Sequence, residues 1–190
     1  VIELKTLLLN LRDTLQRRQK YLRLKANRLL KSPKNLILTV FGISAISLVG
    51  YFLVSNIVVS YGYSIDKSVF WRVHAQGLKK GDYVLVQTDE SDIYAKGRLI
   101  SKIIGCAPGE VLEIRGDEYY CGDDYLGRAK HQSKTGIAVN PFNPCGTFYC
   151  LYKIPENQYF VVGTHKDSYD SRYFGPVNAD KIAAKLLPIW

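Results

Sequence analysis

The sequence of 190 residues predicts a mainly β exterior domain that follows a basic amphipathic helix and one transmembrane helix. Three observations support this prediction. Basic residues concentrate at the start of the chain, an uncharged apolar stretch follows them, and short strand-like runs separated by glycine turns make up most of the rest. These changes in composition predict three regions, residues 1–34, 35–60 and 61–190.

The positive charge lies almost entirely in the first 35 residues. The formal net charge is +9, and this segment holds ten basic side chains against Glu3 and Asp13. The remainder has sixteen basic and fifteen acidic residues, so it is nearly neutral. A domain that binds nucleic acid would need a basic face on its folded part. The distribution therefore indicates a membrane-topology signal and argues against nucleic acid as a partner.

Residues 1–30 have the pattern of an amphipathic helix that ends at Ser32-Pro33. Six leucines fall near one face, with basic residues elsewhere: Leu4, Leu8, Leu11, Leu15, Leu22 and Leu29. One interpretation is a helix on the inner membrane surface, held there by anionic lipid. The other is a docking helix for a partner in a secretion machine. The sequence favours the lipid-bound helix.

No charged residue occurs between Lys34 and Asp66. At about 1.5 Å per residue, the apolar stretch 36–59 is long enough to cross a hydrocarbon core of ~30 Å. A cleavable signal peptide would have a shorter apolar core and a shorter basic region before it. We therefore expect a retained anchor. The positive-inside rule then places residues 1–34 in the cytoplasm and the rest of the chain beyond about residue 60 outside it.

Short strand-like runs separated by turn residues follow the anchor. They cover residues 82–86, 98–104, 111–114, 118–121 and 159–162. Arg115-Gly116-Asp117 joins the third and fourth runs and predicts a hairpin. Residues 180–187 are the one late stretch for which we expect a short helix. Many short strands with glycine turns are typical of a small β-barrel-like or sandwich domain.

Four cysteines lie in the predicted exterior region: Cys106, Cys121, Cys145 and Cys150. An oxidising compartment favours disulfides, and four cysteines allow three connectivities. The first two bracket the predicted hairpin and the last two bracket a short loop, which favours these two pairs. Zinc binding is the alternative, but the sequence has no C-x-x-C pair and no histidine cluster near the cysteines.

Residues 163–177 read G-T-H-K-D-S-Y-D-S-R-Y-F-G-P-V and concentrate polar side chains directly after a strand-like run. An aspartate in such a stretch can accept hydrogen bonds from an arginine and from nearby backbone N–H groups. Taken alone, the stretch would also fit a polar surface turn. Two other stretches accompany it: Y-S-I-D-K-S-V-F at residues 63–70 and L-I-S-K-I-I-G-C-A-P-G-E at residues 99–110.

Together these stretches resemble the signal peptidase I superfamily of Ser/Lys-dyad membrane peptidases. They are most similar to its conjugative-transfer branch, the TraF-type pilin-maturation peptidases. Lys102 precedes Pro-Gly as in the family pattern K-x-x-x-x-x-P-G-[DE], and Ser64 precedes Val-Phe as in S-x-P-x-x-V-[FY]. The resemblance covers roughly residues 61–190 and implies a β-fold and no cofactor.

The resemblance also implies roles for five residues. Ser64 corresponds to the acylating nucleophile and Lys102 to its general base. Ser168 corresponds to the residue that hydrogen-bonds the lysine amine, and Asp170 and Arg172 correspond to residues that support it. The backbone N–H of Ser64 is the expected oxyanion donor, because charge that develops on a carbonyl needs a fixed dipole.

A lysine acts as a base only when its amine is neutral. At its ordinary pKa, roughly one lysine in a few thousand is neutral at pH 7. Burial lowers the pKa of an amine, and in a strand Ile100, Lys102 and Ile104 share one face. The alternative is an ordinary lysine on an exposed strand. The three histidines, His74, His131 and His165, have no evident aspartate partner for a triad.

The chain departs from the family pattern before and after Ser64. Asp66 replaces a proline, and Gly62 stands where many relatives have a serine or threonine that completes the oxyanion hole. Thr164-His165 replaces Asp-Asn in the third stretch. Ser68 is an alternative nucleophile whose spacing fits the motif less well.

The sequence thus predicts a membrane-anchored Ser/Lys endopeptidase of a bacterial inner membrane, with its catalytic domain in the periplasm. Expected substrates are a propilin of a conjugative type IV secretion system or another membrane-presented preprotein. Attack on the acyl-enzyme by water would give cleavage, and attack by the amine of the pilin itself would give a cyclic product. The alternatives are a general type I signal peptidase and a non-catalytic scaffold of the secretion channel.

Overall fold

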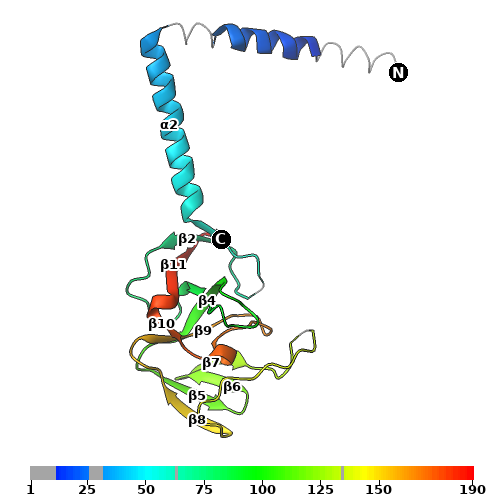
Figure 1. Cartoon of the computed structure of the whole chain (residues 1–190), viewed down its shortest axis with the longest axis vertical. Coiled ribbons are helices and arrows are strands. Elements are labelled where there is room, and N and C mark those ends of the chain that lie inside the picture. Colours follow the sequence, from blue (N-terminus) through cyan, green and yellow to red (C-terminus); the bar gives the residue numbers. More distant parts are fainter. Residues whose placement is uncertain (1–11, 26–31, 63, 134) are drawn as a thin grey trace, which may run out of the picture. The chain divides into compact units, whose positions relative to one another are not determined.

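The computed structural model describes residues 12–25, 32–62, 64–133 and 135–190 (Figure 1). The chain forms two units, Val1–Ser55 and Asn56–Trp190. The first contains the two long helical segments. The second contains the strands, which confirms the prediction of a mainly β domain.

In the first unit, residues 12–25 are helical and helix α2 spans Pro33–Asn56. The rest of the predicted amphipathic helix, residues 1–11 and 26–30, lies outside the described residues. Helix α2 is long and apolar enough to cross a membrane. Two of its hydroxyl groups bond within the helix: Thr39 Oγ1 donates to the Asn35 carbonyl and Ser55 Oγ donates to the Tyr51 carbonyl, both at 2.7 Å. Such bonds satisfy polar groups that lipid could not.

The second unit consists of two antiparallel sheets. The larger has seven strands in the order β1-β2-β11-β3-β4-β9-β10, and the smaller has four in the order β7-β6-β5-β8. The strands of the larger sheet are β1 Ile57–Val59, β2 Val69–Val73, β3 Tyr83–Gln87, β4 Leu99–Cys106, β9 Gln158–Val162, β10 Val177–Asn178 and β11 Ile182–Pro188. Those of the smaller sheet are β5 Val111–Arg115, β6 Glu118–Cys121, β7 Asp124–Arg128 and β8 Tyr149–Lys153. A short helix, α3, spans Ser171–Phe174.

The five predicted strand-like runs correspond to β3, β4, β5, β6 and β9, and β5 and β6 form the predicted hairpin. The short helix expected over residues 180–187 is wrong. A single 3-10 turn, η1 Ala179–Lys181, leads into strand β11. This strand pairs with β2 on one side and β3 on the other, and its alternate residues Ile182, Ala184 and Leu186 are buried. Pairing on both sides outweighs the helix propensity of the alanines and lysines.

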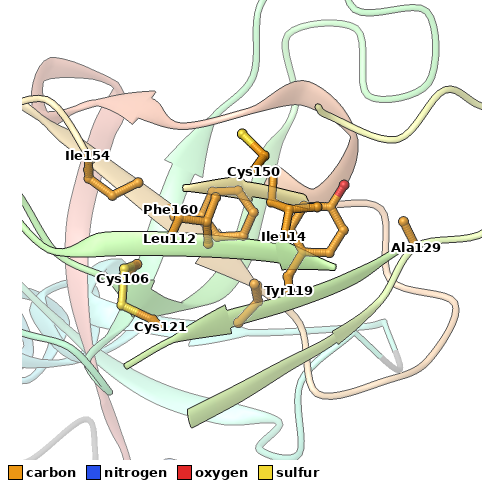
Figure 2. Packing of buried hydrophobic residues seen from close by; sticks show 10 residues of the cluster. Cys106, Leu112, Ile114, Tyr119, Cys121, Ala129, Cys150, Ile154 and Phe160 are labelled. Carbon is orange, nitrogen blue, oxygen red and sulfur yellow. A yellow bond between two sulfur atoms is a disulfide. The ribbon is translucent and has the colours of Figure 1, made fainter. Parts of the chain in front are cut away.

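The two sheets meet in a core of aliphatic and aromatic side chains (Figure 2). Leu112 and Ile114 on β5 and Tyr119 on β6 pack with Phe160 on β9, and the rings of Tyr119 and Phe160 stack with centroids 5.8 Å apart. The larger sheet therefore contributes β9 and the smaller sheet β5 and β6 to one core.

Both preferred disulfides are present. Cys106–Cys121 joins the end of β4 in one sheet to the end of β6 in the other (Figure 2). Cys145–Cys150 closes the loop that leads into β8. The cysteines are therefore committed to covalent pairs, and the zinc alternative has no free thiolate among the residues described.

Candidate active site

Lys102 lies in the interior of the domain on strand β4. Its side chain is 2% exposed, and it is opposite Val84 of β3, which is fully buried. Ile104 is buried on the same face of β4, as the alternation in the sequence predicted. The lysine therefore lies beside buried aliphatic residues of β3 and β4.

Burial lowers the pKa of Lys102 to about 8 from an ordinary 10.5. The nearby Asp170 carboxylate opposes this shift, and the Arg172 guanidinium adds to it. At a pKa of 8, roughly one lysine in ten is neutral at pH 7. The neutral amine is therefore accessible at ordinary pH.

The lysine amine has a hydroxyl partner. Lys102 Nζ donates to Ser168 Oγ at 2.8 Å, and Ser168 is 3% exposed. The two residues are 66 positions apart in the chain. This bond fixes the end of a long side chain that would otherwise adopt several rotamers.

Asp170 and Arg172 form a buried, bidentate ion pair behind Ser168. Arg172 Nε donates to Asp170 Oδ1 at 2.8 Å and Nη2 donates to Oδ2 at 2.7 Å. The carboxylate also accepts the backbone N–H of Gly163 at 2.8 Å and that of Arg172 at 3.2 Å, which caps helix α3. A buried ion pair is stabilising only when its remaining hydrogen-bonding capacity is met, and here it is.

The backbone of Ser64 and the hydroxyl of Ser168 both lie against Gly163. A Cβ atom on Gly163 would lie 2.4 Å from the Ser64 carbonyl oxygen and 2.1 Å from Ser168 Oγ. The Ser64 carbonyl also accepts the His165 backbone N–H at 3.3 Å. Only glycine fits between these two serines, because any side chain at 163 would overlap both.

The structure therefore joins Lys102 to Ser168 and Asp170 to Arg172 by direct hydrogen bonds. Gly163 donates its backbone N–H to Asp170, and the Ser64 backbone lies against this glycine. Among the described residues, no hydrogen bond joins the Ser64 hydroxyl to Lys102. Catalytic hydrogen bonds are commonly long in unliganded enzymes and shorten when substrate binds.

The structure shows the surroundings of two positions that depart from the family pattern, Asp66 and Gly62. Asp66 accepts a hydrogen bond from the Tyr83 hydroxyl at 2.8 Å, so the loop that lacks the proline is tied to strand β3. Burial first, and the Asp66 carboxylate second, raise the pKa of Tyr83 to about 12. At Gly62, a Cβ atom would lie 3.8 Å from both Ser64 N and Ser64 Oγ, so a side chain would fit beside the serine.

Ser68, the alternative nucleophile, lies just before β2. Its backbone N–H donates to the Trp190 carbonyl at 3.3 Å, and its own carbonyl accepts the Ser60 N–H at 2.8 Å. No bond in the described part of the chain connects it to Lys102 or Ser168.

Sequence reasoning missed three residues that build the site. Ser171 Oγ accepts the Val161 backbone N–H at 2.9 Å and so joins α3 to β9. The Tyr119 hydroxyl donates to the carbonyls of Phe142 and Arg172, at 2.7 and 3.2 Å. At Gly127 on β7, a Cβ atom would lie 2.4 Å from Arg172 Nη1. The D-S-R triplet could have pointed to Ser171, but no local signal marks the other two.

Two clefts flank this group. One has a volume of about 530 Å³ and an apolar floor that includes Ile103, Leu126 and Val162, and it reaches Gly163. The other, of about 520 Å³, includes Gly62 and Asp66. Thr164 and His165 line both clefts, so the stretch that follows Gly163 separates them.

The site thus combines a buried lysine, a buried serine bonded to it and a second serine whose backbone lies against Gly163, a residue that lines the first cleft. The family described as signal peptidase, peptidase S26, matches residues 33–190. The chain therefore belongs to this family of serine peptidases.

Curated relatives match about half of the chain. Signal peptidase I T of Bacillus subtilis (strain 168) is 32% identical over 114 residues, which is 55% of this chain and 53% of the relative. Signal peptidase I of Bacillus amyloliquefaciens is 32% identical over 101 residues, which is 50% of this chain and 47% of the relative. The chain thus spans about half the length of these relatives. The crystal structure of a signal peptidase I from Enterococcus faecalis V583 aligns with a TM-score of 0.37 at 23% identity, covering 58% of this chain and 97% of that one.

Proposed function

We propose that this protein is a membrane-anchored endopeptidase that removes leader segments from membrane-presented preproteins, with Ser64 as nucleophile and Lys102 as general base. The observation that supports it most directly is the burial of Lys102, which lowers its pKa to about 8 beside the Ser168 hydroxyl. A buried amine of this kind costs stability, and strongly shifted pKa values are typical of functional sites.

In the first step, the neutral Lys102 amine takes the proton from the Ser64 hydroxyl as the oxygen attacks the scissile carbonyl. The backbone N–H of Ser64 donates to the oxyanion. The protonated lysine then gives its proton to the leaving amine as the C–N bond breaks, which leaves an ester between the substrate and Ser64. Water, activated by the same lysine, hydrolyses this ester and restores the serine.

Ser168, Asp170 and Arg172 act as positioning residues in this scheme. Ser168 aims the amine, and the Asp170–Arg172 pair holds the turn that carries Ser168. Because Asp170 also binds the Gly163 N–H, the pair fixes the glycine against which Ser64 lies.

The proposed location is a bacterial inner membrane, with the basic N-terminal segment in the cytoplasm and the β domain in the periplasm. The two disulfides fit an oxidising compartment. Helix α2 is the proposed anchor, which would keep the site near substrates held in the same membrane.

A propilin of a conjugation system is the particular substrate that we propose, because S-Y-D-S-R-Y-F-G-P-V at residues 168–177 is similar to the pilin-maturation branch. In that case the pilin amine could replace water in the second step and give a cyclic subunit. General leader removal accounts equally well for the geometry of the site.

Intact-mass spectrometry of a candidate preprotein, co-expressed with the full chain, tests the proposal. The wild type should shorten the substrate, and Ser64→Ala and Lys102→Ala should leave it full length. Lys153→Ala is the matched control, since Lys153 is an exposed lysine on strand β8. A product one water lighter than the linear fragment would indicate cyclisation. Processing by both site variants at the wild-type level would refute the dyad and favour a scaffold role.

A further inference from the structure

The larger of the two clefts has a charge pattern that the proposed catalysis does not explain. Four basic side chains are among the residues that line it, and no carboxylate is: Arg128, Lys130, Lys166 and Arg172. Residues 36–190 as a whole have nearly equal numbers of basic and acidic residues. The basic lining is therefore local to this cleft.

The four cations differ in how far they are neutralised. Arg172 is fully engaged with the buried Asp170. Arg128 pairs with Glu118 at 3.0 Å and Lys130 pairs with Asp167, yet their side chains remain 66% and 46% exposed. Lys166 is exposed and makes no ion pair within the described residues. We call the three exposed cations, Arg128, Lys130 and Lys166, the rim of the cleft. The rim keeps a net positive charge that a bound group can reach.

The floor of the cleft is apolar and borders the proposed catalytic residues. Leu126 lies on β7, and Ile103 and Val162 are the chain neighbours of Lys102 and Gly163. Gly163 itself lines the cleft and contacts both Ser64 and Ser168. A peptide bound for cleavage at Ser64 would therefore extend into this cleft on one side of the scissile bond.

We propose that this cleft binds the substrate segment beside the scissile bond and selects segments in which an acidic side chain accompanies an apolar one. The apolar residue would lie on the floor, and the carboxylate would face Lys166 and Arg128 at the rim. A basic residue at the same place would meet like charge. This inference rests on the proposed peptidase function and specifies its substrate class.

Because the rim is exposed to solvent, its preference for acidic substrates should act on substrate binding. Salt screens exposed charges, so this preference should weaken as the ionic strength rises. Exposed ion pairs contribute modestly, so exchanging Asp for Lys in the substrate should change kcat/KM by about fivefold, mainly through KM. The ratio of kcat/KM for the Asp and Lys peptides should approach one at high ionic strength.

The test uses full-length protein in vesicles of uncharged zwitterionic lipid and a set of peptides that differ at one position. Asp, Asn and Lys are placed in turn at each of several positions on both sides of the cleavage site, and kcat and KM are measured. Wild type should favour Asp over Lys on one side of the bond only. Lys166→Glu should reverse that preference, measured as the ratio of kcat/KM for the Asp and Lys peptides within the variant, with its own Asn peptide as the internal reference.

Lys153→Glu is the control, because it makes the same change in net charge on an exposed strand outside the cleft. It should keep the preference of the wild type. Equal rates on Asp, Asn and Lys peptides at every position would overturn the inference while leaving the peptidase function intact. A preference for Asp that is unchanged in Lys166→Glu would also overturn it, because Lys166 would then not contact the acidic side chain. Failure to cleave any peptide would reject the proposed function itself.

Discussion

This domain buries an ion pair, Asp170 with Arg172, and a separate lysine, Lys102, and the two differ in how their charge is compensated. Asp170 and Arg172 neutralise each other through two hydrogen bonds, and backbone N–H groups meet the remaining demand of the carboxylate. Lys102 has a neutral serine as its bonding partner, and burial lowers its pKa to about 8. Compensated charge thus supports the architecture, whereas the uncompensated charge of Lys102 shifts its pKa toward the range that the proposed base needs.

The largest effect is expected for Lys102→Met, which removes the uncompensated charge and keeps much of the volume. Activity should fall to background, since the nucleophile loses its base. The free energy of unfolding should rise by about 1–3 kcal/mol at pH 7, because a costly buried amine is gone. Denaturant unfolding and peptide cleavage measure the two effects.

The gain in stability should also depend on pH. The folded-state pKa of Lys102 lies below the ordinary value of 10.5, so the folded protein binds fewer protons than the unfolded chain between about pH 8 and 10.5. Wild-type stability therefore rises through this window, and the advantage of Lys102→Met shrinks there. A variant that is less stable than wild type at pH 7 would contradict the comparison.

The next effect is expected for Asp170→Asn, which leaves Arg172 buried without its counter-charge. Removing one partner of a buried pair costs about 3–5 kcal/mol. In addition, Asp170 raises the pKa of Lys102 at present, so its loss should lower that pKa further. Thermal unfolding measures the first change, and the acidic limb of the pH–rate profile measures the second. If the acidic limb of the profile moved to higher pH instead, the assignment of that limb to Lys102 would be contradicted.

A third prediction concerns the wild-type pH profile. If neutral Lys102 is the base, kcat/KM should rise about tenfold per pH unit below 8 and level off above it. The lysine must lose its proton before it can accept one from Ser64, which fixes the direction. A profile that is flat from pH 6 to 9, measured with a peptide that does not titrate in that range, would rule out Lys102 as the base.

The smallest effect comes from a change that leaves both charged groups alone. A side chain at Gly62 would fit beside Ser64, so Gly62→Ser supplies a hydroxyl where relatives of the family are expected to have one. An added oxyanion donor should raise kcat by roughly tenfold or less. This is smaller than the ~100-fold or greater loss of kcat that follows when one donor is removed from a complete oxyanion hole. Gly62→Ala controls for the backbone, and it should match wild type. Equal kcat for the serine and alanine variants would show that the hydroxyl does not reach the oxyanion.

Much of this architecture was predictable because it depends on local pattern. The uncharged stretch predicted helix α2, Arg115-Gly116-Asp117 predicted the β5–β6 hairpin, and alternation along β4 placed Lys102 on an apolar face. The bracketing of short segments by cysteines also indicated the two disulfides.

The sequence by itself, through its resemblance to the signal peptidase family, marked Ser64, Lys102 and the S-x-D-S-R stretch as the candidates for the proposed chemistry. Only the tertiary structure decided how they are held. Gly163 fits between two serines, Tyr119 and Gly127 reach Arg172 from the smaller sheet, and β11 is a strand because β2 and β3 lie on either side of it. Each of these depends on segments distant in the chain, and a local pattern carries no information about which distant backbone will come within contact distance.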